Sequence, residues 1–536
     1  MRHLGASSGA AGPAGRRAPA ASGRLQQQGC ARPPPRPRRR APAAAAQPQP
    51  SAPAAAAAAG RPQQQAPPPA YLEDSATAAF LAWARGAGAS FERLRPASFA
   101  GLRGLAAAAP IKADDLILSV PRGAAITLPP KQRCPCPEFV TPAFWDAAPW
   151  FVRLGVRLLA ERAKGPSSGL APYLQQLPKA VDTPVSWSGE RLQQLQYPYL
   201  IQKVTEQQQE WAALHEGLCA GMAPGVPPPS RADFFWALAC VRSRTFSGPY
   251  VASTLSDRLR LAGLVAFLVV GNTLAQGPDS LANSAGAAVA AFVFNILYET
   301  ILSGKLKQYA LCPVIDLANH SSSETAEVSY DYFRDAFVVA AGRDYAPGSQ
   351  VFVSYGTQSN DSLMQYYGFA EPSNPADSYV MVSLLKWLEQ LAQPSQARLG
   401  ELNGAGLLPA LQEVAVTRQG FAPRTLQALR FLLAPDGAPG GPAAFEAPGG
   451  AALEERVGLV LVHACRQELA ALGTSLEEDL ALAAAGPGGG GGGGGAGRRG
   501  GARRDGGAAD AAAVAFRIEK KRVLAECLRQ LTGGSG

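Results

Sequence analysis

The residues best suited to chemistry in this chain gather between positions 312 and 369. Asn319-His320 follows an apolar run, and Ser354-Tyr355-Gly356 comes about 35 residues later. Ser359-Asn360 and the run Tyr366-Tyr367-Gly368-Phe369 complete the set. Alone, an Asn-His pair is most often a capping turn, because both side chains tolerate turn geometry and bond nearby backbone. Four such segments in one order are a far more specific signal, and a phenol can orient a polar group without carrying charge.

In this order the segments resemble the C-terminal half of a SET domain, the fold that moves a methyl group from S-adenosyl-L-methionine to a lysine. The resemblance implies that the Asn-His and tyrosine segments cross in a knot-like arrangement and form one wall of the cofactor pocket. It implies cofactor contacts from Gly101, Leu102, Arg103, Arg244, Asn319 and His320. It implies substrate contacts from Arg244, Asp316, Tyr330, Tyr355 and Tyr367, with Tyr355 as the catalytic residue.

Physical chemistry agrees with these implied roles. A glycine such as Gly101 suits a loop that approaches a ligand, because it has no Cβ. The guanidinium of Arg244 is suited to binding a carboxylate through two hydrogen bonds, although a charge on a helix surface is the simpler interpretation of that residue. The acceptor lysine must arrive as a neutral amine aligned with the methyl group, and a dry pocket lined by tyrosines favours that form. No G-x-G-x-x-G follows a predicted strand, which disfavours a Rossmann-type methyltransferase.

The segments outside the site indicate one branch of the family. The chain has no cysteine-rich zinc segment after Phe369, and it carries a long helical insertion with the stretches 158–178 and 234–246. With a helical C-terminal region, this resembles the Rubisco large-subunit methyltransferase group over roughly 73–532. Gly248 stands where that pattern has a second arginine, and the stretch 248–310 is longer than usual, so the Rubisco substrate itself is in doubt.

The order of elements predicts an α+β fold: a SET-domain β-fold with small sheets and a helical insertion, followed by an all-α substrate-binding-like domain. We expect a helix and turn over 80–97, a strand–turn–strand unit over 101–121, helices over 141–246 with an extended connector at 170–178, and strands over 311–356. The predicted domains are a disordered segment 1–70, a SET domain 71–370 with its insertion at about 128–310, and a helical domain 371–536 with a disordered glycine-rich loop at 486–507.

The charge of the chain lies at its beginning. The formal net charge is +9, yet the first 72 residues hold ten arginines and no acidic residue, so the remainder carries −1. A near-neutral folded part predicts no nucleic-acid partner. An N-terminus rich in Ala, Pro, Gln, Ser and Arg is typical of an organellar transit peptide, here assigned to the plastid through the family resemblance. A disordered basic tail is the alternative.

The cysteines argue against a metal-binding or disulfide-bonded protein, and one apolar segment raises the question of a membrane hairpin. The eight cysteines lie scattered, without the paired spacing of a zinc site or a disulfide framework, so no metal is predicted. The segment 261–298 carries almost no charge and is rich in Ala, Val, Leu and Phe. A membrane hairpin is one interpretation, and a pair of apolar helices packed on the domain is the favoured one.

The sequence therefore predicts a monomeric protein-lysine N-methyltransferase of the plastid stroma that uses S-adenosyl-L-methionine. Its partner is a protein substrate, with the Rubisco large subunit, aldolase and other stromal proteins as candidates. Two alternatives remain open: a SET-like scaffold that has lost catalysis within a plastid complex, and a protein-histidine methyltransferase.

Overall fold

The structure, a computed structural model, describes residues 69–248, 307–331, 334–435, 438–485 and 506–533, with the side chains of 506–510 excepted. All of these residues belong to one compact unit, 66–536. The predicted transit segment 1–70, the apolar stretch 248–310 with 261–298 inside it, and the glycine-rich loop 486–507 lie wholly or almost wholly outside the described residues.

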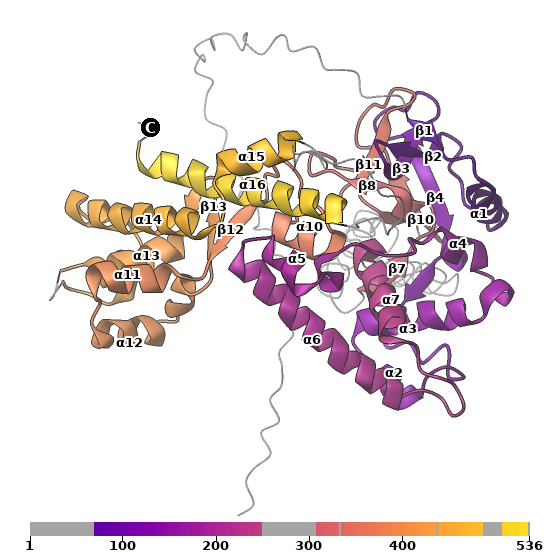
Figure 1. Cartoon of the computed structure of the whole chain (residues 1–536), viewed down its shortest axis with the longest axis horizontal. Coiled ribbons are helices and arrows are strands. Elements are labelled where there is room, and N and C mark those ends of the chain that lie inside the picture. Colours follow the sequence, from indigo (N-terminus) through magenta and orange to yellow (C-terminus); the bar gives the residue numbers. More distant parts are fainter. Residues whose placement is uncertain (1–68, 249–306, 332–333, 436–437, 486–505, 534–536) are drawn as a thin grey trace, which may run out of the picture. The chain divides into compact units, whose positions relative to one another are not determined.

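A five-stranded sheet in the order β1-β2-β3-β11-β8 brings the predicted site segments together. Its strands are β1 (Ala70–Tyr71), β2 (Leu94–Phe99), β3 (Leu102–Ala107), β11 (Gln350–Val353) and β8 (Asn319–His320). Strand β8 pairs in parallel with β11, which places Asn319 beside Phe352 and His320 beside Val353. The Asn-His pair and the chain leading into Tyr355 are therefore neighbours, and β3 flanks β11 on the other side (Figure 1).

The predicted unit over 101–121 does hold two strands, but they lie in different sheets, and β2 occupies part of the stretch 80–97 that was expected to be a helix and turn. Strands β2 and β3 are joined by Ala100 and Gly101, whose φ angles of 49° and 90° give a two-residue turn of the kind that matches the twist of a hairpin. Strand β4 (Leu116–Pro121) pairs with β10 (Ala336–Ala340), which pairs with β9 (Ser329–Asp331). A third sheet has the order β5-β7-β6, from Ile126–Leu128, Gln308–Leu311 and Thr245–Gly248.

Helices fill the first half of the predicted insertion. They are α1 (Ser75–Gly86), ahead of the insertion, and then α2 (Pro142–Ala147), α3 (Trp150–Ala163), α4 (Ala171–Gln176), α5 (Gly189–Gln193), α6 (Pro198–Ala220) and α7 (Arg231–Arg244). The expectation of an extended connector over 170–178 is wrong, because α4 lies there. Pro172 occupies the first turn of α4, where a missing N–H costs no hydrogen bond, so the proline starts a helix instead of preventing one.

The C-terminal region is helical, as predicted, and it also carries a small sheet. Its helices are α11 (Leu384–Ala392), α12 (Gln396–Gly404), α13 (Pro423–Leu433), α14 (Ala451–Ala471), α15 (Leu476–Ala485) and α16 (Gly506–Leu531). Strands β12 (Ser378–Met381), β13 (Val414–Thr417) and β14 (Gly420–Phe421) form a three-stranded sheet, which corrects the expectation of an all-α domain. These strands hold two to four residues, too few for a clear alternating pattern.

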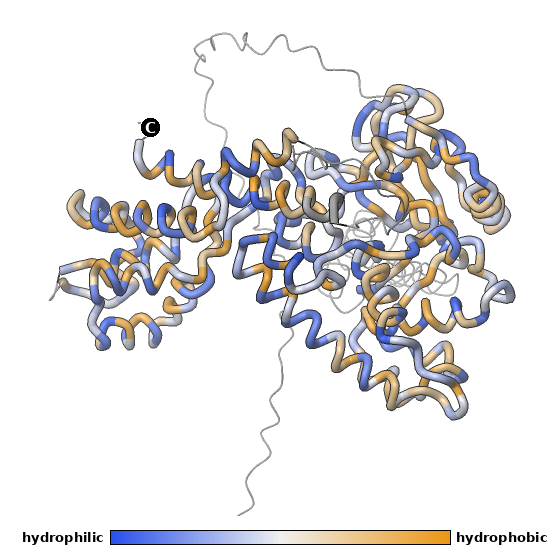
Figure 2. Tube along the Cα trace, in the orientation of Figure 1, coloured by the Kyte–Doolittle hydropathy of each residue, from blue (hydrophilic) through white to orange (hydrophobic). Residues whose placement is uncertain are grey.

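Two hydrophobic cores support these parts. One includes Phe80, Trp145 and Phe337 and lies under the SET-like sheets and the helices α3, α4 and α7. The other includes Tyr379, Phe431 and Phe516 and lies among β12–β13, α13, α14 and α16. Figure 2 shows hydrophilic and hydrophobic residues alternating along the C-terminal helices, as expected for helices that bury one face. Within the described residues, every helix is too short or too polar to cross a bilayer.

Candidate active site

Tyr355 is fixed by the crossing of two segments that are distant in the sequence. Its backbone N–H donates to Nδ1 of His320 at 3.1 Å, and its ring stacks on the imidazole with centroids 5.0 Å apart. Its hydroxyl donates to the carbonyl of Ala318 at 2.9 Å. The phenol is thus held at both ends, and its oxygen keeps lone pairs that can face a ligand.

Tyr367 completes an aromatic pair with Tyr355. The two rings stack with centroids 4.9 Å apart. Tyr367 is the last residue of α10 (Asn360–Tyr367), which ends at Gly368 with φ of 78°. A Cβ at Gly368 would lie 2.2 Å from the carbonyl oxygen of Asp182, so a glycine is required there for α10 to reach this position. Burial raises the pKa of both phenols above the ordinary value, so each is neutral near pH 7.

His320 is a neutral structural partner of the tyrosine segment. Its Nδ1 accepts the Tyr355 amide, so the ring proton lies on Nε2, which is 3.7 Å from Oε2 of Glu371. Burial lowers the pKa of His320 below the ordinary value, although the charge of Glu371 opposes the shift. The neutral imidazole orients the backbone at Tyr355, which agrees with the predicted place of His320 in the wall of the cofactor pocket.

Asn319 links the crossing segments to β3. Its Nδ2 donates to the carbonyl of Arg103 at 2.9 Å, so two predicted cofactor residues are in contact. A Cβ at Gly104 would lie 2.9 Å from Asn319 Nδ2 and 2.7 Å from Gln350 Nε2, which makes this glycine necessary for the close approach. Gly101 was predicted from the sequence and Gly104 was not, since nothing local distinguishes the two glycines.

Arg103 crosses from β3 to α4. Its Nη1 donates to the carbonyl of Gln176 at 2.9 Å, and its Nη2 donates to the side-chain oxygen of the same residue. Its Nε is buried and has no hydrogen-bond partner in the described part of the chain. Gln176 was missed by the sequence analysis, because the helix that carries it was expected to be an extended connector.

The half-buried Arg244 and the buried Asp316 face each other. Arg244 Nη1 donates to the Asp316 carbonyl at 2.9 Å and lies 3.7 Å from its Oδ2, which also accepts the Tyr173 hydroxyl at 2.8 Å. Asp316 Oδ1 and Arg244 Nε are buried without a hydrogen-bond partner among the described residues. Burial raises the pKa of the Asp316 carboxyl, against the opposing charge of Arg244. Tyr173, on α4, was missed by the sequence analysis.

Three predicted residues lie apart from this cluster. Gly101 forms the turn of the β2–β3 hairpin, and Leu102 beside it is 58% exposed. The hydroxyl of Tyr330 bonds Asp335, and its ring packs edge-on against Phe337 within the β9–β10 hairpin. The cofactor role of Gly101 and Leu102 and the substrate role of Tyr330 stay predictions.

Comparison with known proteins assigns the family. The SET domain family matches residues 102–356, which span the crossing segments, Arg244 and Tyr355. Residues 102–356 of the chain form a SET domain. The predicted α+β SET fold is confirmed, since the matched range holds the crossing segments and the strands from β3 to β11.

Curated relatives of this SET-domain protein differ in their targets. It is 24% identical over 306 residues to the actin-histidine N-methyltransferase of Danio rerio, a match that covers 55% of this chain and 42% of that protein. It is 24% identical over 370 residues to the chloroplastic ribulose-1,5 bisphosphate carboxylase/oxygenase large subunit N-methyltransferase of Nicotiana tabacum, covering 63% and 62%. The matches thus span less than two thirds of either relative.

The SET-domain protein also shares its fold with solved structures. The structure of Rubisco LSMT bound to AdoMet aligns with a TM-score of 0.56 and 20% identity, covering 86% of this chain and 92% of that one. Rubisco LSMT bound to sinefungin and monomethyllysine aligns with a TM-score of 0.55 and 19% identity over the same shares. The similarity of fold extends beyond the SET domain into the helical C-terminal region.

The residues of this SET domain fit S-adenosyl-L-methionine, the cofactor that SET methyltransferases use and the one predicted from the sequence. Buried donors without partners among the described residues, Nε of Arg103 and of Arg244, suit a carboxylate. The Oδ1 of Asp316, which is buried and has no hydrogen-bond partner in the described ranges, suits a positively charged or N–H-bearing group. Polar groups buried without partners are costly, so both signs of charge in one place indicate a zwitterionic or mixed ligand.

Proposed function

We propose that this protein is an S-adenosylmethionine-dependent protein methyltransferase and that its target is a lysine of a plastid stromal protein. The observation that carries the proposal is the neutral, stacked pair Tyr355–Tyr367, held by the crossing of residues 319–320 with 353–355. Among the described residues, Arg103 Nε, Arg244 Nε and Asp316 Oδ1 of this site have no hydrogen-bond partner, so each can bind a polar ligand.

The chain's own residues favour attack by a neutral amine. S-adenosylmethionine, when bound, supplies a methyl group on a positive sulfur that leaves as a neutral thioether. The rings of Tyr355 and Tyr367 make a wall of low polarity, which lowers the pKa of a lysine beside them and favours the free amine. Because the Tyr355 hydroxyl donates to the Ala318 carbonyl, its oxygen lone pairs are free to accept an amine N–H and to face the positive methyl group.

Different observations support lysine as the target residue and the plastid as the location of the protein. A channel lined by two phenols suits a long apolar stem with an amine at its end. A relative in Nicotiana tabacum is named as a chloroplastic Rubisco large subunit N-methyltransferase. The arginine-bearing, acid-free N-terminus supports import into the plastid stroma.

Histidine methylation is a second candidate, favoured by one specific observation. A relative named actin-histidine N-methyltransferase matches at 24% identity, the same as the Rubisco-directed relative. A histidine target presents a flat ring with a second nitrogen, which requires its own hydrogen-bond partner when it is buried. A site for histidine must therefore offer a hydrogen-bond partner for this second nitrogen, which a site for lysine does not need.

The test is transfer of a labelled methyl group from S-adenosylmethionine to proteins of a stromal extract. We expect labelled protein with the wild type, little with Tyr355→Phe, and wild-type labelling with Tyr71→Phe, an exposed tyrosine on β1. Mass spectrometry of the labelled site distinguishes lysine from histidine. Calorimetry with S-adenosylmethionine addresses the scaffold alternative, since a chain that neither binds it nor labels any stromal protein is not a methyltransferase.

A further inference from the structure

Arg242, near the end of α7, is held by aromatic rings. Its guanidinium carbon lies 4.0 Å from the centroid of Tyr366, 5.5 Å from that of Trp150 and 5.7 Å from that of Phe151. Trp150 in turn stacks on Tyr309 with centroids 4.0 Å apart and planes within 2°. All five side chains are half-buried. The guanidinium is therefore confined by contacts with ring faces, which attract a cation without neutralising it.

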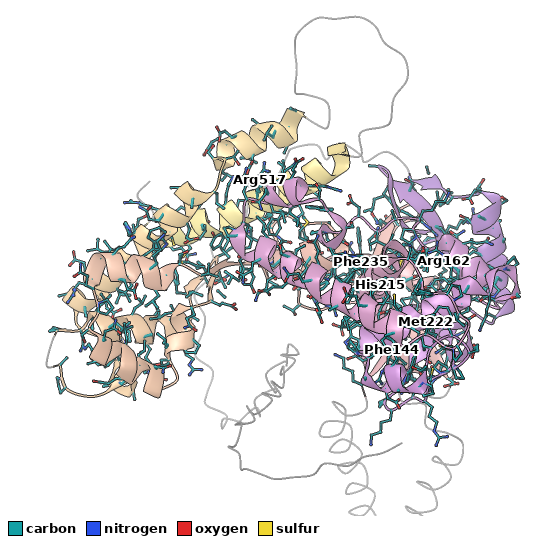
Figure 3. All side chains as sticks on the ribbon, turned by 60° about the horizontal axis from the view of Figure 1, so that its bottom comes forward. Phe144, Arg162, His215, Met222, Phe235 and Arg517 are labelled. Carbon is teal, nitrogen blue, oxygen red and sulfur yellow. The ribbon has the colours of Figure 1, made fainter. Side chains whose placement is uncertain are left out.

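Within the described parts of the chain no carboxylate lies at ion-pair distance from Arg242, although Glu210 on α6 is near enough for the charge of Arg242 to oppose the burial that raises the pKa of its carboxyl. Other arginines nearby are paired. Arg244, two residues further on, faces Asp316. Arg162 on α3, labelled in Figure 3, lies over the ring of Trp236 at 4.3 Å and also pairs with Asp233 at 3.2 Å. Arg242 thus combines an aromatic cradle with hydrogen-bond donors that no described side chain uses.

The position of Arg242 connects it to the proposed lysine channel. Tyr366 precedes Tyr367, which stacks on Tyr355, and α10 packs directly against α7. Burial raises the pKa of the Tyr367 phenol, and the charge of Arg242 opposes that shift, so the two groups are within electrostatic reach. A second cation lies on the same surface, since Lys307 Nζ is 5.5 Å from the centroid of Tyr309.

We propose that Arg242 binds an acidic side chain of the protein substrate, located a few residues from the methylated residue. The proposal deepens the proposed function and rests on it. Stacking fixes the plane of the guanidinium, so less side-chain freedom is lost when two parallel N–H···O bonds form to a carboxylate. An acidic group also complements Arg242 and Lys307, two cations on this surface that form no ion pair with the residues that the structure describes.

The test uses an oriented peptide library with a central lysine and degenerate flanking positions, labelled from S-adenosylmethionine and then sequenced. Wild-type protein is compared with Arg242→Gln, Arg242→Glu and the control Arg162→Gln. We expect the wild type and the control to enrich Asp or Glu at a flanking position. We expect Arg242→Gln to lose this enrichment with a rise in KM of about tenfold and little change in kcat, because the contact is equal in ground and transition states.

The charge-reversal variant is the most decisive comparison. Peptides labelled by Arg242→Glu should be enriched in Lys or Arg at the flanking position where the wild type enriches Asp or Glu. Equal flanking preferences in wild type and Arg242→Gln overturn the inference while leaving the methyltransferase proposal intact. A wild type that labels no peptide counts against the proposed function instead. In that case the binding of labelled peptides is measured by fluorescence anisotropy, with either Asp or Glu, or the matching Asn or Gln, beside the lysine. If wild type and Arg242→Gln show the same preference between the acidic and the amide peptides, the inference is wrong.

Discussion

Replacing the buried Lys520 of α16 with methionine should reduce the unfolding free energy by about 3–5 kcal/mol, the usual cost of removing one partner from a buried charge network. Its Nζ donates to Asp361 Oδ2 at 3.0 Å, to Asp377 Oδ1 at 2.7 Å and to the Ser378 carbonyl at 2.7 Å. Lys520 is only 1% exposed, so water cannot replace these bonds. The helix α10, which carries Tyr367, begins beside this network.

The two carboxylates should respond differently to the loss of Lys520. Asp377 also accepts bonds from the backbone and side-chain N–H groups of Asn360, at 3.0 and 2.8 Å, and from the backbone of Ser378. Asp361 has one oxygen already unpartnered among the described residues, and it would lose the partner of the other. Adding Asp361→Asn to Lys520→Met should therefore restore most of the stability, whereas adding Asp377→Asn should not.

The pH dependence provides a second measure of the same network. Burial raises the pKa of Asp361 in the folded state, while Lys520 opposes the shift. A carboxyl with a raised folded pKa binds more protons folded than unfolded, so stability rises as the pH falls. Without Lys520 the pKa rises further, and the deficit of the variant should be smaller at pH 5.5 than at pH 7.5.

Urea unfolding followed by tryptophan fluorescence at both pH values measures these differences. Lys164→Met is the matched control, since Lys164 pairs with Glu161 at 2.7 Å but is 43% exposed, and its loss should cost about 0–1 kcal/mol. A loss below about 1 kcal/mol for Lys520→Met, or equal rescue by Asp361→Asn and Asp377→Asn, would refute the reasoning.

Three further predictions concern the site itself. Gly104→Ala should weaken S-adenosylmethionine binding about tenfold by calorimetry, because the new Cβ displaces Asn319 from its hydrogen bond to the backbone of β3. Tyr173→Phe should lower the unfolding free energy by about 1–3 kcal/mol in urea, since Asp316 Oδ2 loses its phenol donor while buried; an unchanged midpoint contradicts this. Burial lowers the pKa of His320 in the folded state, so as the pH drops the unfolded state is protonated first. The unfolding free energy should therefore fall as the pH drops through the ordinary value of 6.5, and His320→Asn should remove this pH dependence.

Much of the fold could be predicted because it rests on local patterns. The strands β3 and β4, the helices α1, α3, α6 and α7, and the strands around the Asn-His pair all follow from residue periodicity and turn residues, whereas β2 lies partly in a stretch that was expected to be a helix and turn. The failures were also local. A proline was interpreted as a breaker when it stood in the first turn of α4, and strands as short as β14 offered no period to detect.

By itself the sequence determined which residue types are available for chemistry and in what order: an Asn-His pair, a Tyr-Gly step and a second tyrosine before a glycine. Only the tertiary structure decided that His320 accepts a hydrogen bond from the amide of Tyr355 and that Asn319 lies against Gly104, which leaves room for it. The same holds for the hydrogen bond from Tyr173 to Asp316, which are 143 residues apart in the chain. The physical reason is that hydrogen bonds between distant segments form only after the cores bring those segments together, whereas turns and helix starts are set by neighbours in the chain.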